Sequence, residues 1–303
     1  MTDTILVAAH GPDAADAVAL GADLARLHAA QLVLVGIYVV PAGPYARAFE
    51  HAARQALQRD LDALAAAVPG DVGHATLLHA SSSVVRGLRE LAESHDADAL
   101  VLGPSHRGPV GRVVHGDTTA ALLHGAPCAV AVAPRGWARA GRHLGERVVG
   151  VAWDDGPEAR IALDAAARIA ERTGAELKLI SVVEPLPRSS ALDFPDDEAL
   201  ARSRRETATA AAEEAAAAVA GRCTVETIVL DGIPAGRALV DAGPGLDVLV
   251  MGSRAYGPLR RVLFGSVSTH VVHAAACPVL VLPRGASTEP DAGQERVAEH
   301  AAG

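Results

Sequence analysis

One stretch of sequence occurs twice in this chain, and this internal duplication limits the possible folds more than any other feature. Residues 98–136 align with residues 247–285 without a gap, and 17 of the 39 positions are identical. The start of each half also corresponds, since ILVAAHGPDAADAVAL resembles VVGVAWDDGPEARIAL. Chance would give only a few such matches, so the 303 residues predict two domains of one design joined head to tail.

Short apolar segments alternate with helical patterns in both halves, such as those at 159–172 and 197–220. Nearly continuous apolar runs are typical of strands buried on both faces, and strand–helix alternation indicates right-handed βαβ units. We therefore expect an α/β fold in which each half forms its own five-stranded parallel sheet, the two being related by a pseudo-twofold axis rather than merged into one sheet. The expected strands are 4–9, 31–39, 72–79, 98–103 and 128–133, then 147–153, 176–183, 223–230, 246–252 and 277–282.

The repeat also sets the expected domain boundaries. Residues 1–136 form the first domain, a linker rich in Gly and Arg follows at 137–146, and residues 147–284 form the second domain. The tail at 285–303 has no apolar periodicity, so we expect it to be disordered.

Composition excludes several classes of function. The 27 basic and 36 acidic residues give a net charge of −9, which argues against nucleic acid or an anionic membrane as a partner. No apolar run approaches the ~20 residues of a membrane helix, and no charged, then apolar, then small-residue segment is visible near Met1, so we expect neither a membrane helix nor a signal peptide. The three cysteines lack CxxC spacing, as expected in a reduced cytoplasm.

Known catalytic motifs are missing from the sequence. A single lysine, Lys178, lies in an apolar run, so no P-loop is present, and neither GxGxxG, HExxH nor GxSxG occurs. His270 and His273 are spaced like two ligands on one helix, but no third ligand accompanies them, so we expect no metal site. We therefore expect a protein that is not an enzyme.

The best candidate site lies in the second half, where strands one and four end in 153–156 and 251–254. Ligands of open parallel sheets bind at such carboxyl ends. Gly265 lets a backbone approach a ligand closely, and Ser266 is expected to be the N-cap of the helix that follows. A helix N-terminus of this kind favours phosphate, with Asp154 facing a ribose. Charge could be added by Arg254, Arg260 and Arg261.

The spacing Gly252-x2-Ala255-x9-Gly265-Ser266, with Asp154 at the end of strand one, resembles the universal stress protein motif G-x2-G-x9-G-[S/T]. The resemblance extends from residue 5 to residue 283. It implies two tandem Rossmann-like domains (adenine nucleotide alpha hydrolase-like) and a cytoplasmic regulatory protein of the stress response that binds ATP, with or without Mg²⁺.

The resemblance also assigns roles to residues. Asp154 would meet the ribose or adenine, and Val182 would contact the adenine through its backbone. Met251 and Gly252 would line the ribose and phosphate path. The phosphates would be held by Gly265, Ser266 and Val267, with Arg254 and Ala255 in the connecting loop. Ala255 adds a methyl group where the motif has glycine, which puts the affinity in doubt.

The first half departs further from the motif. Its matching residues are Gly103-x2-His106-x9-Gly116-Asp117, with His10 at the strand-one position. Asp117 near a phosphate would cost roughly 4 kcal/mol at ~4 Å unless a magnesium ion bridged the charges. We therefore predict at most one tight nucleotide per chain, held by the second half.

Three functions stay open at this point. The first is the nucleotide-binding regulator, the second a scaffold that acts through protein contacts without nucleotide, and the third a slow ATP hydrolase. Domains of the resembling family pair through their last strands, here 129–133 and 279–282. The two halves could pair within one chain, or the chain could form a homodimer. Nothing in the sequence names a protein partner.

Overall fold

The computed structural model describes residues 3–9, 11, 13–39, 46–104, 121–122, 125–185, 197–253 and 265–283. In the first half, strands β1 to β5 span Thr4–Ala8, Gln31–Val39, His74–Ser81, Ala99–Leu102 and Ala129–Val132. In the second half, β6 to β10 span Val148–Trp153, Glu176–Val183, Val225–Asp231, Val248–Gly252 and Val279–Leu282. Every strand that the sequence predicts is therefore present, with ends within a few residues of the predicted ones.

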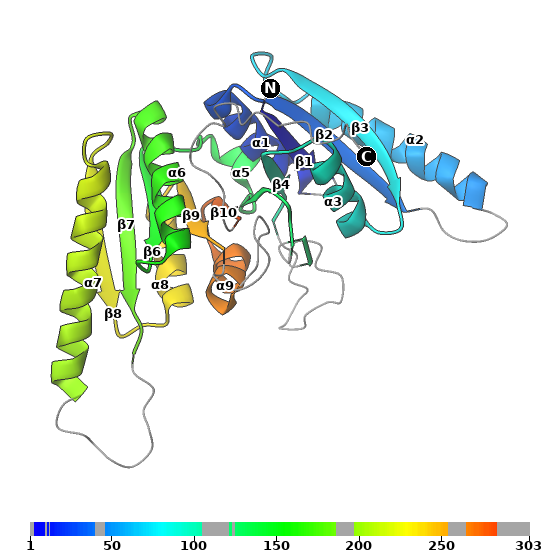
Figure 1. Ribbon diagram of the computed structural model, residues 1–303. Coiled ribbons are helices and arrows are strands. Elements are labelled where there is room, and N and C mark those ends of the chain that lie inside the picture. The colour runs from blue at the N-terminus through cyan, green and yellow to red at the C-terminus, as the bar shows by residue number, and fades with distance from the viewer. Residues whose placement is uncertain are drawn as a thin grey trace, which may run out of the picture.

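The helices alternate with these strands along the chain (Figure 1). The first half contains α1 (Ala14–His28), α2 (Ala46–Ala65) and α3 (Val84–Ser94), and α5 (Trp137–Ala140) follows its last strand. The second half contains α6 (Pro157–Thr173), α7 (Asp197–Val219), α8 (Ala235–Ala242), a 3₁₀ turn at Gly243–Gly245 and α9 (Ser266–Ala274). The helices predicted at 159–172 and 197–220 correspond to α6 and α7. No helix in the described ranges is long and apolar enough to cross a bilayer.

All ten strands form one sheet, in the order β3-β2-β1-β4-β5-β10-β9-β6-β7-β8. Within each half the strands are parallel, as predicted. The expectation that the sheet would not continue from one half into the other is wrong. The last strands pair antiparallel, with Val279 opposite Val132 and Val281 opposite Val130. Each half would otherwise end in a strand with unpaired backbone groups, and this pairing satisfies both edges within the chain.

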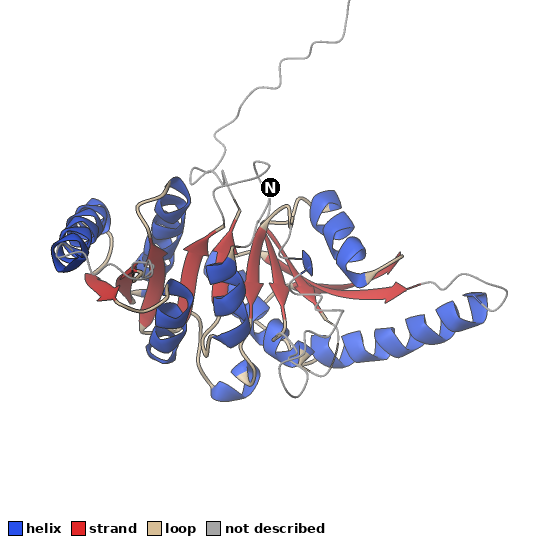
Figure 2. Cartoon of the chain, turned by 90° about the horizontal axis from the view of Figure 1, so that it is seen from below, coloured by secondary structure: helices blue, strands red, loops and turns tan. Residues whose placement is uncertain are grey.

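Helices cover both faces of the sheet (Figure 2). One hydrophobic cluster lies under α1, α2, α6 and α7, and the other lies under α3, α8 and α9. Alanines dominate the buried side of α6, where Ala162, Ala166, Ala167 and Ala170 have no exposed surface. Small side chains let this helix lie close to the Val- and Leu-rich strands, which explains how a chain with 3% aromatic residues builds a dense core.

Residues 136–146, which we call the connecting segment, pack tightly against both halves. Trp137 is only 3% exposed. Asp16 of α1 accepts hydrogen bonds from the backbone N–H groups of Gly136 and Ala138, at 2.8 and 3.0 Å. At the other end, Arg142 donates to Asp247 at the start of β9. The sequence predicted only a linker here, and residues 284–303, the predicted disordered tail and the residue before it, lie outside the described residues.

Candidate functional site

A cavity of about 420 Å³ opens in the second half at the carboxyl ends of β6, β7 and β9. The starts of α6, α8 and α9 complete its walls. Seven of the nine residues that the sequence singled out line it: Asp154, Val182, Met251, Gly252, Gly265, Ser266 and Val267. The structure therefore brings together segments that lie more than 100 residues apart in the chain.

The remaining predicted residues lie outside the described part of the chain. These are Arg254 and Ala255 of the candidate site, and Arg260 and Arg261 shortly after them in the sequence. In the first half they are His10, His106, Gly116 and Asp117, so the predicted difference between the two halves at these positions stays a prediction.

The turn from β6 into α6 fixes the position of Asp154. Its Oδ1 accepts a hydrogen bond from the backbone N–H of Gly156 at 3.0 Å, which closes a tight turn. Asp155 has a φ of 60°, the left-handed conformation that aspartate tolerates, and pairs with Arg160 at 2.6 Å. The carboxylate of Asp154 is thus held at the cavity wall while it stays exposed to solvent.

Gly252 has a packing role that the sequence did not reveal. A Cβ at this position would lie 2.6 Å from the backbone oxygen of Glu158 in the first turn of α6. Glycine is therefore required for the end of β9 to approach α6. Gly103, the matching residue of the first half, plays a milder version of this role, since its Cβ would lie 3.3 Å from the backbone oxygen of Asp13.

The start of α9 differs from the prediction. The N-cap residue is Gly265, in an extended conformation, and Ser266 is the first residue of the helix rather than its cap. Among the described residues no side chain caps this helix, and the Thr269 hydroxyl donates to the Gly265 carbonyl. The first N–H groups of a helix have no partner within the helix, and they carry the positive end of its dipole. At the wall of a cavity, this end favours an anionic group.

The cavity wall also contains residues to which the sequence analysis gave no role, among them Ser253, Trp153 and Glu158. Ser253 is 4% exposed, and its hydroxyl is buried without a hydrogen-bond partner among the described residues. Trp153, beneath the Arg160 guanidinium at 5.8 Å, forms part of the wall. Glu158 is also buried there. Ser253 and Trp153 adjoin the predicted Gly252 and Asp154, so sequence adjacency was the signal that could have found them.

The charge of the described cavity wall is negative. Asp154 and Glu158 both line it, and the described lining residues include no lysine, arginine or histidine. Within the described ranges, no group of three or more His, Cys, Asp or Glu side chains could hold a metal ion.

Comparison with known proteins gives one match for each half of the internal repeat. The model of the Universal stress protein family matches residues 1–134 and again residues 146–283. A universal stress protein of Mycobacterium tuberculosis is 33% identical over 212 residues, which are 62% of this chain and 62% of the relative, so the chain spans less than two thirds of that relative's length.

A solved structure agrees on the fold. A universal stress protein from Archaeoglobus fulgidus superposes with a TM-score of 0.67 at 17% identity, covering 94% of this chain and all of the other. Another universal stress protein, solved in complex with cAMP, aligns with 46% of this chain over 97% of its own length, at 25% identity and with a TM-score of 0.31. Because the family model matches both halves over nearly their whole length, the chain belongs to the universal stress protein family.

Proposed function

We propose that the second half binds ATP or another adenine nucleotide and that the protein acts in the cytoplasm as a non-catalytic regulator of the stress response. The observation that carries this proposal is the cavity at the ends of β6 and β9. It joins the carboxylate of Asp154 to the start of a helix whose N-cap residue is the glycine Gly265. Its volume of about 420 Å³ lies within the range of small-molecule sites, about 300–1,000 Å³.

The cavity offers a suitable partner for each part of a nucleotide. Ile180, Val182, Leu239 and Met251 supply apolar surface for a base. Asp154 supplies carboxylate oxygens that accept hydrogen bonds from ribose hydroxyls. Gly265 and Ser266 bring the start of α9 to the phosphates. Because Asp154 and Glu158 are both acidic, bound phosphates would need Mg²⁺ or the arginines of the 254–264 loop to offset the repulsion.

We further propose that each chain binds one nucleotide tightly. The sequence of the first half supports this asymmetry, because Asp117 stands where the second half has Ser266 and His10 stands where it has Asp154. Binding confined to the second half leaves the first half to act mainly as its pairing partner through β5 and β10.

The test is nucleotide extraction followed by calorimetry on the full chain. Purified protein is denatured, the released small molecules are identified, and the stripped protein is titrated with ATP in the presence and absence of Mg²⁺. We expect one site per chain and its loss in Gly265→Asp, which places a charged side chain at the start of α9. Two equivalent sites, or unchanged affinity in the variant, would contradict the proposal.

A second candidate function is a scaffold that acts through protein contacts without nucleotide. Ala255 in place of the motif glycine and the negative charge of the described cavity wall favour it. Protein that releases no nucleotide and gives no heat with ATP would support the scaffold. ATP turnover by the pure protein, lost in Gly265→Asp, would instead support an enzyme.

A further inference from the structure

A second cavity, of about 290 Å³, lies between α1, the end of α2 and the connecting segment. It shares no lining residue with the candidate nucleotide site. Cavities at the junction of packed segments are common places for small ligands, and this volume is close to the lower end of their usual range, about 300 Å³. Nothing in the proposed nucleotide function uses it.

The walls of this cavity are mainly apolar and built from small side chains. Ala15, Ala19 and Ala22 of α1 face the end of α2, and Trp137 of the connecting segment also lines the cavity. Alanines leave room where larger residues would fill the space between two packed helices. A ligand here would bury apolar surface, which is the main favourable contribution to its binding.

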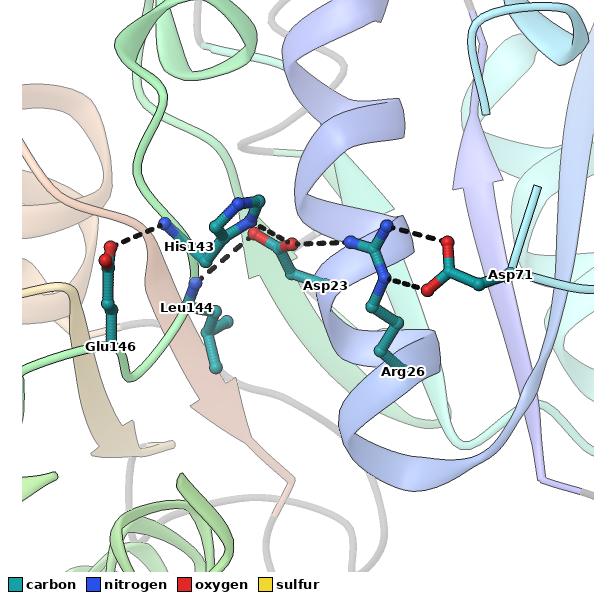
Figure 3. A network of polar contacts seen from close by, with 6 residues as sticks. All are labelled: Asp23, Arg26, Asp71, His143, Leu144 and Glu146. Carbon is teal, nitrogen blue, oxygen red and sulfur yellow. Dashed lines mark hydrogen bonds and ion pairs between the residues drawn. The ribbon is translucent and has the colours of Figure 1, made fainter. Parts of the chain in front are cut away.

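The polar end of the cavity contains charges that already have partners (Figure 3). Arg26 donates from Nε and Nη2 to the two oxygens of Asp71, at 2.6 and 3.0 Å. Arg142 donates to Asp247 at 2.8 Å. An anionic ligand would have to displace one of these carboxylates, and a cationic ligand would face the two guanidinium groups. The cavity therefore favours a neutral molecule.

His143 supplies a hydrogen-bond acceptor at the same end. Its Nδ1 lies 2.9 Å from Oδ1 of Asp23 (Figure 3). The other oxygen of Asp23, Oδ2, accepts a hydrogen bond from the Leu144 backbone N–H at 3.2 Å. Because a carboxylate only accepts, Nδ1 carries the hydrogen in this contact, and in the neutral tautomer that the contact selects Nε2 is an acceptor. The ligand that matches this end carries an O–H or N–H donor.

We propose that this cavity is a second ligand site, for a small neutral molecule with an apolar body and one O–H or N–H donor, such as a phenol. The apolar body lies among the alanines of α1 and Trp137, and the donor binds Nε2 of His143. The site depends on the connecting segment, so it belongs to the tandem chain and not to either domain alone.

Phenol is the probe for the first experiment. The chain has two tryptophans, Trp137 and Trp153, so Trp153→Phe leaves Trp137 as the only indole reporter. This replacement removes no hydrogen bond, because Nε1 of Trp153 has no partner among the described residues. We expect phenol to change the Trp137 fluorescence saturably, with a dissociation constant in the millimolar range, and calorimetry on the wild-type chain to give the same value.

Two further probes test the predicted chemistry. Toluene has a similar size but no donor, and phenyl phosphate carries negative charge. We expect toluene to bind about threefold to tenfold more weakly than phenol, the effect of one hydrogen bond, and phenyl phosphate not to bind. His143→Ala should weaken phenol binding by the same factor and leave toluene unchanged, since Leu144 and Arg26 still hold Asp23.

Ala19→Leu fills the cavity and should abolish binding of phenol and toluene alike. Ala217→Leu, on the exposed side of α7, is the matched control and should bind both as the wild type does. ATP should not compete with phenol, so failure of the nucleotide proposal leaves this result unaffected. The proposal is overturned if neither fluorescence nor calorimetry detects phenol, if Ala19→Leu binds it normally, or if His143→Ala weakens toluene as much as phenol.

Discussion

The first helices of the two halves occupy equivalent places in the sheet but differ at two buried positions. Ala25 of α1 and Ala170 of α6 each accept a hydrogen bond from the residue that precedes the next strand, and in this register Asp16 and Asp23 correspond to Ile161 and Arg168. Both aspartates bind the connecting segment, whereas Arg168 pairs with Asp164 of its own helix. The difference teaches that two polar residues of one helix hold the connecting segment, while the alanine-rich packing of the first helix is common to both halves.

The aspartates that precede β4 and β9 give a second matched pair. Asp98 accepts from the backbone N–H of Thr4, and Asp247 accepts from that of Val148. Asp247 also binds Arg142 and the Arg147 backbone, and it is only 3% exposed, while Asp98 is exposed. The carboxylate thus holds the start of a strand in both halves, and in the second half it also holds the connecting segment through Arg142.

The largest effect that separates the halves should come from Asp247→Ala. It removes the ion pair with Arg142, which keeps the Leu246 carbonyl as an acceptor, and leaves two backbone N–H groups without their acceptor, so we expect a loss of about 3–5 kcal/mol in the free energy of unfolding. Asp98→Ala is the matched control and should cost less than about 1 kcal/mol, because water replaces its exposed carboxylate. Urea unfolding of both variants measures this, and equal losses would refute the asymmetry.

Asp16→Ala should come next. Two backbone N–H groups of the connecting segment, those of Gly136 and Ala138, lose their acceptor, which should cost about 2–3 kcal/mol. Thermal unfolding measures the loss, and limited proteolysis should show faster cleavage within residues 136–146. An unchanged cleavage rate would mean that the antiparallel pairing of β5 with β10 holds the connecting segment in place without Asp16.

The two glycines at the strand ends allow a comparison of packing. Gly252→Ala places a methyl group 2.6 Å from the Glu158 backbone oxygen, and we expect a cost of about 1–3 kcal/mol from the forced shift of α6. Gly103→Ala meets its neighbour at 3.3 Å and should cost less. Denaturant midpoints of the two variants rank them, and the reverse order would show that α1 is held more rigidly than α6.

The smallest effect concerns pH. Although the Asp98 side chain reaches solvent, the protein atoms around its carboxyl desolvate it and raise its pKa above the ordinary value, and the nearby Asp3 and Asp96 add to the shift. The folded state therefore favours the protonated form, and this contribution is lost as pH rises through the folded pKa. Asp98→Asn should be slightly more stable than the wild type at pH 7 and equal to it below about pH 4. Asp247→Asn should instead be less stable at pH 7, because it loses the ion pair with Arg142.

The sequence by itself determined the duplicated α/β fold and the position of every strand. Continuous apolar runs, alanine-rich helices and the repeated Gly and Pro positions are local signals, and they lie within single segments. The same signals placed Asp154, Gly252, Gly265 and Ser266 at strand and helix ends, and parallel strands necessarily bring such ends to one edge of the sheet.

Only the tertiary structure decided how the halves meet. The family resemblance offered pairing of 129–133 with 279–282 within one chain, and β5 and β10 do pair. Edge strands have no sequence mark that says which edge they will pair with, so the sequence did not show that this pairing joins the two sheets into one. The roles of Asp16, Asp23 and Asp247 also depend on partners that are about 100 residues or more away in the chain, and as single residues they read as ordinary polar positions. A contact between elements decides the role of Gly252, which lets β9 lie close to α6. A backbone conformation decides that Gly265 rather than Ser266 is the N-cap of α9. Residue type alone decides neither role.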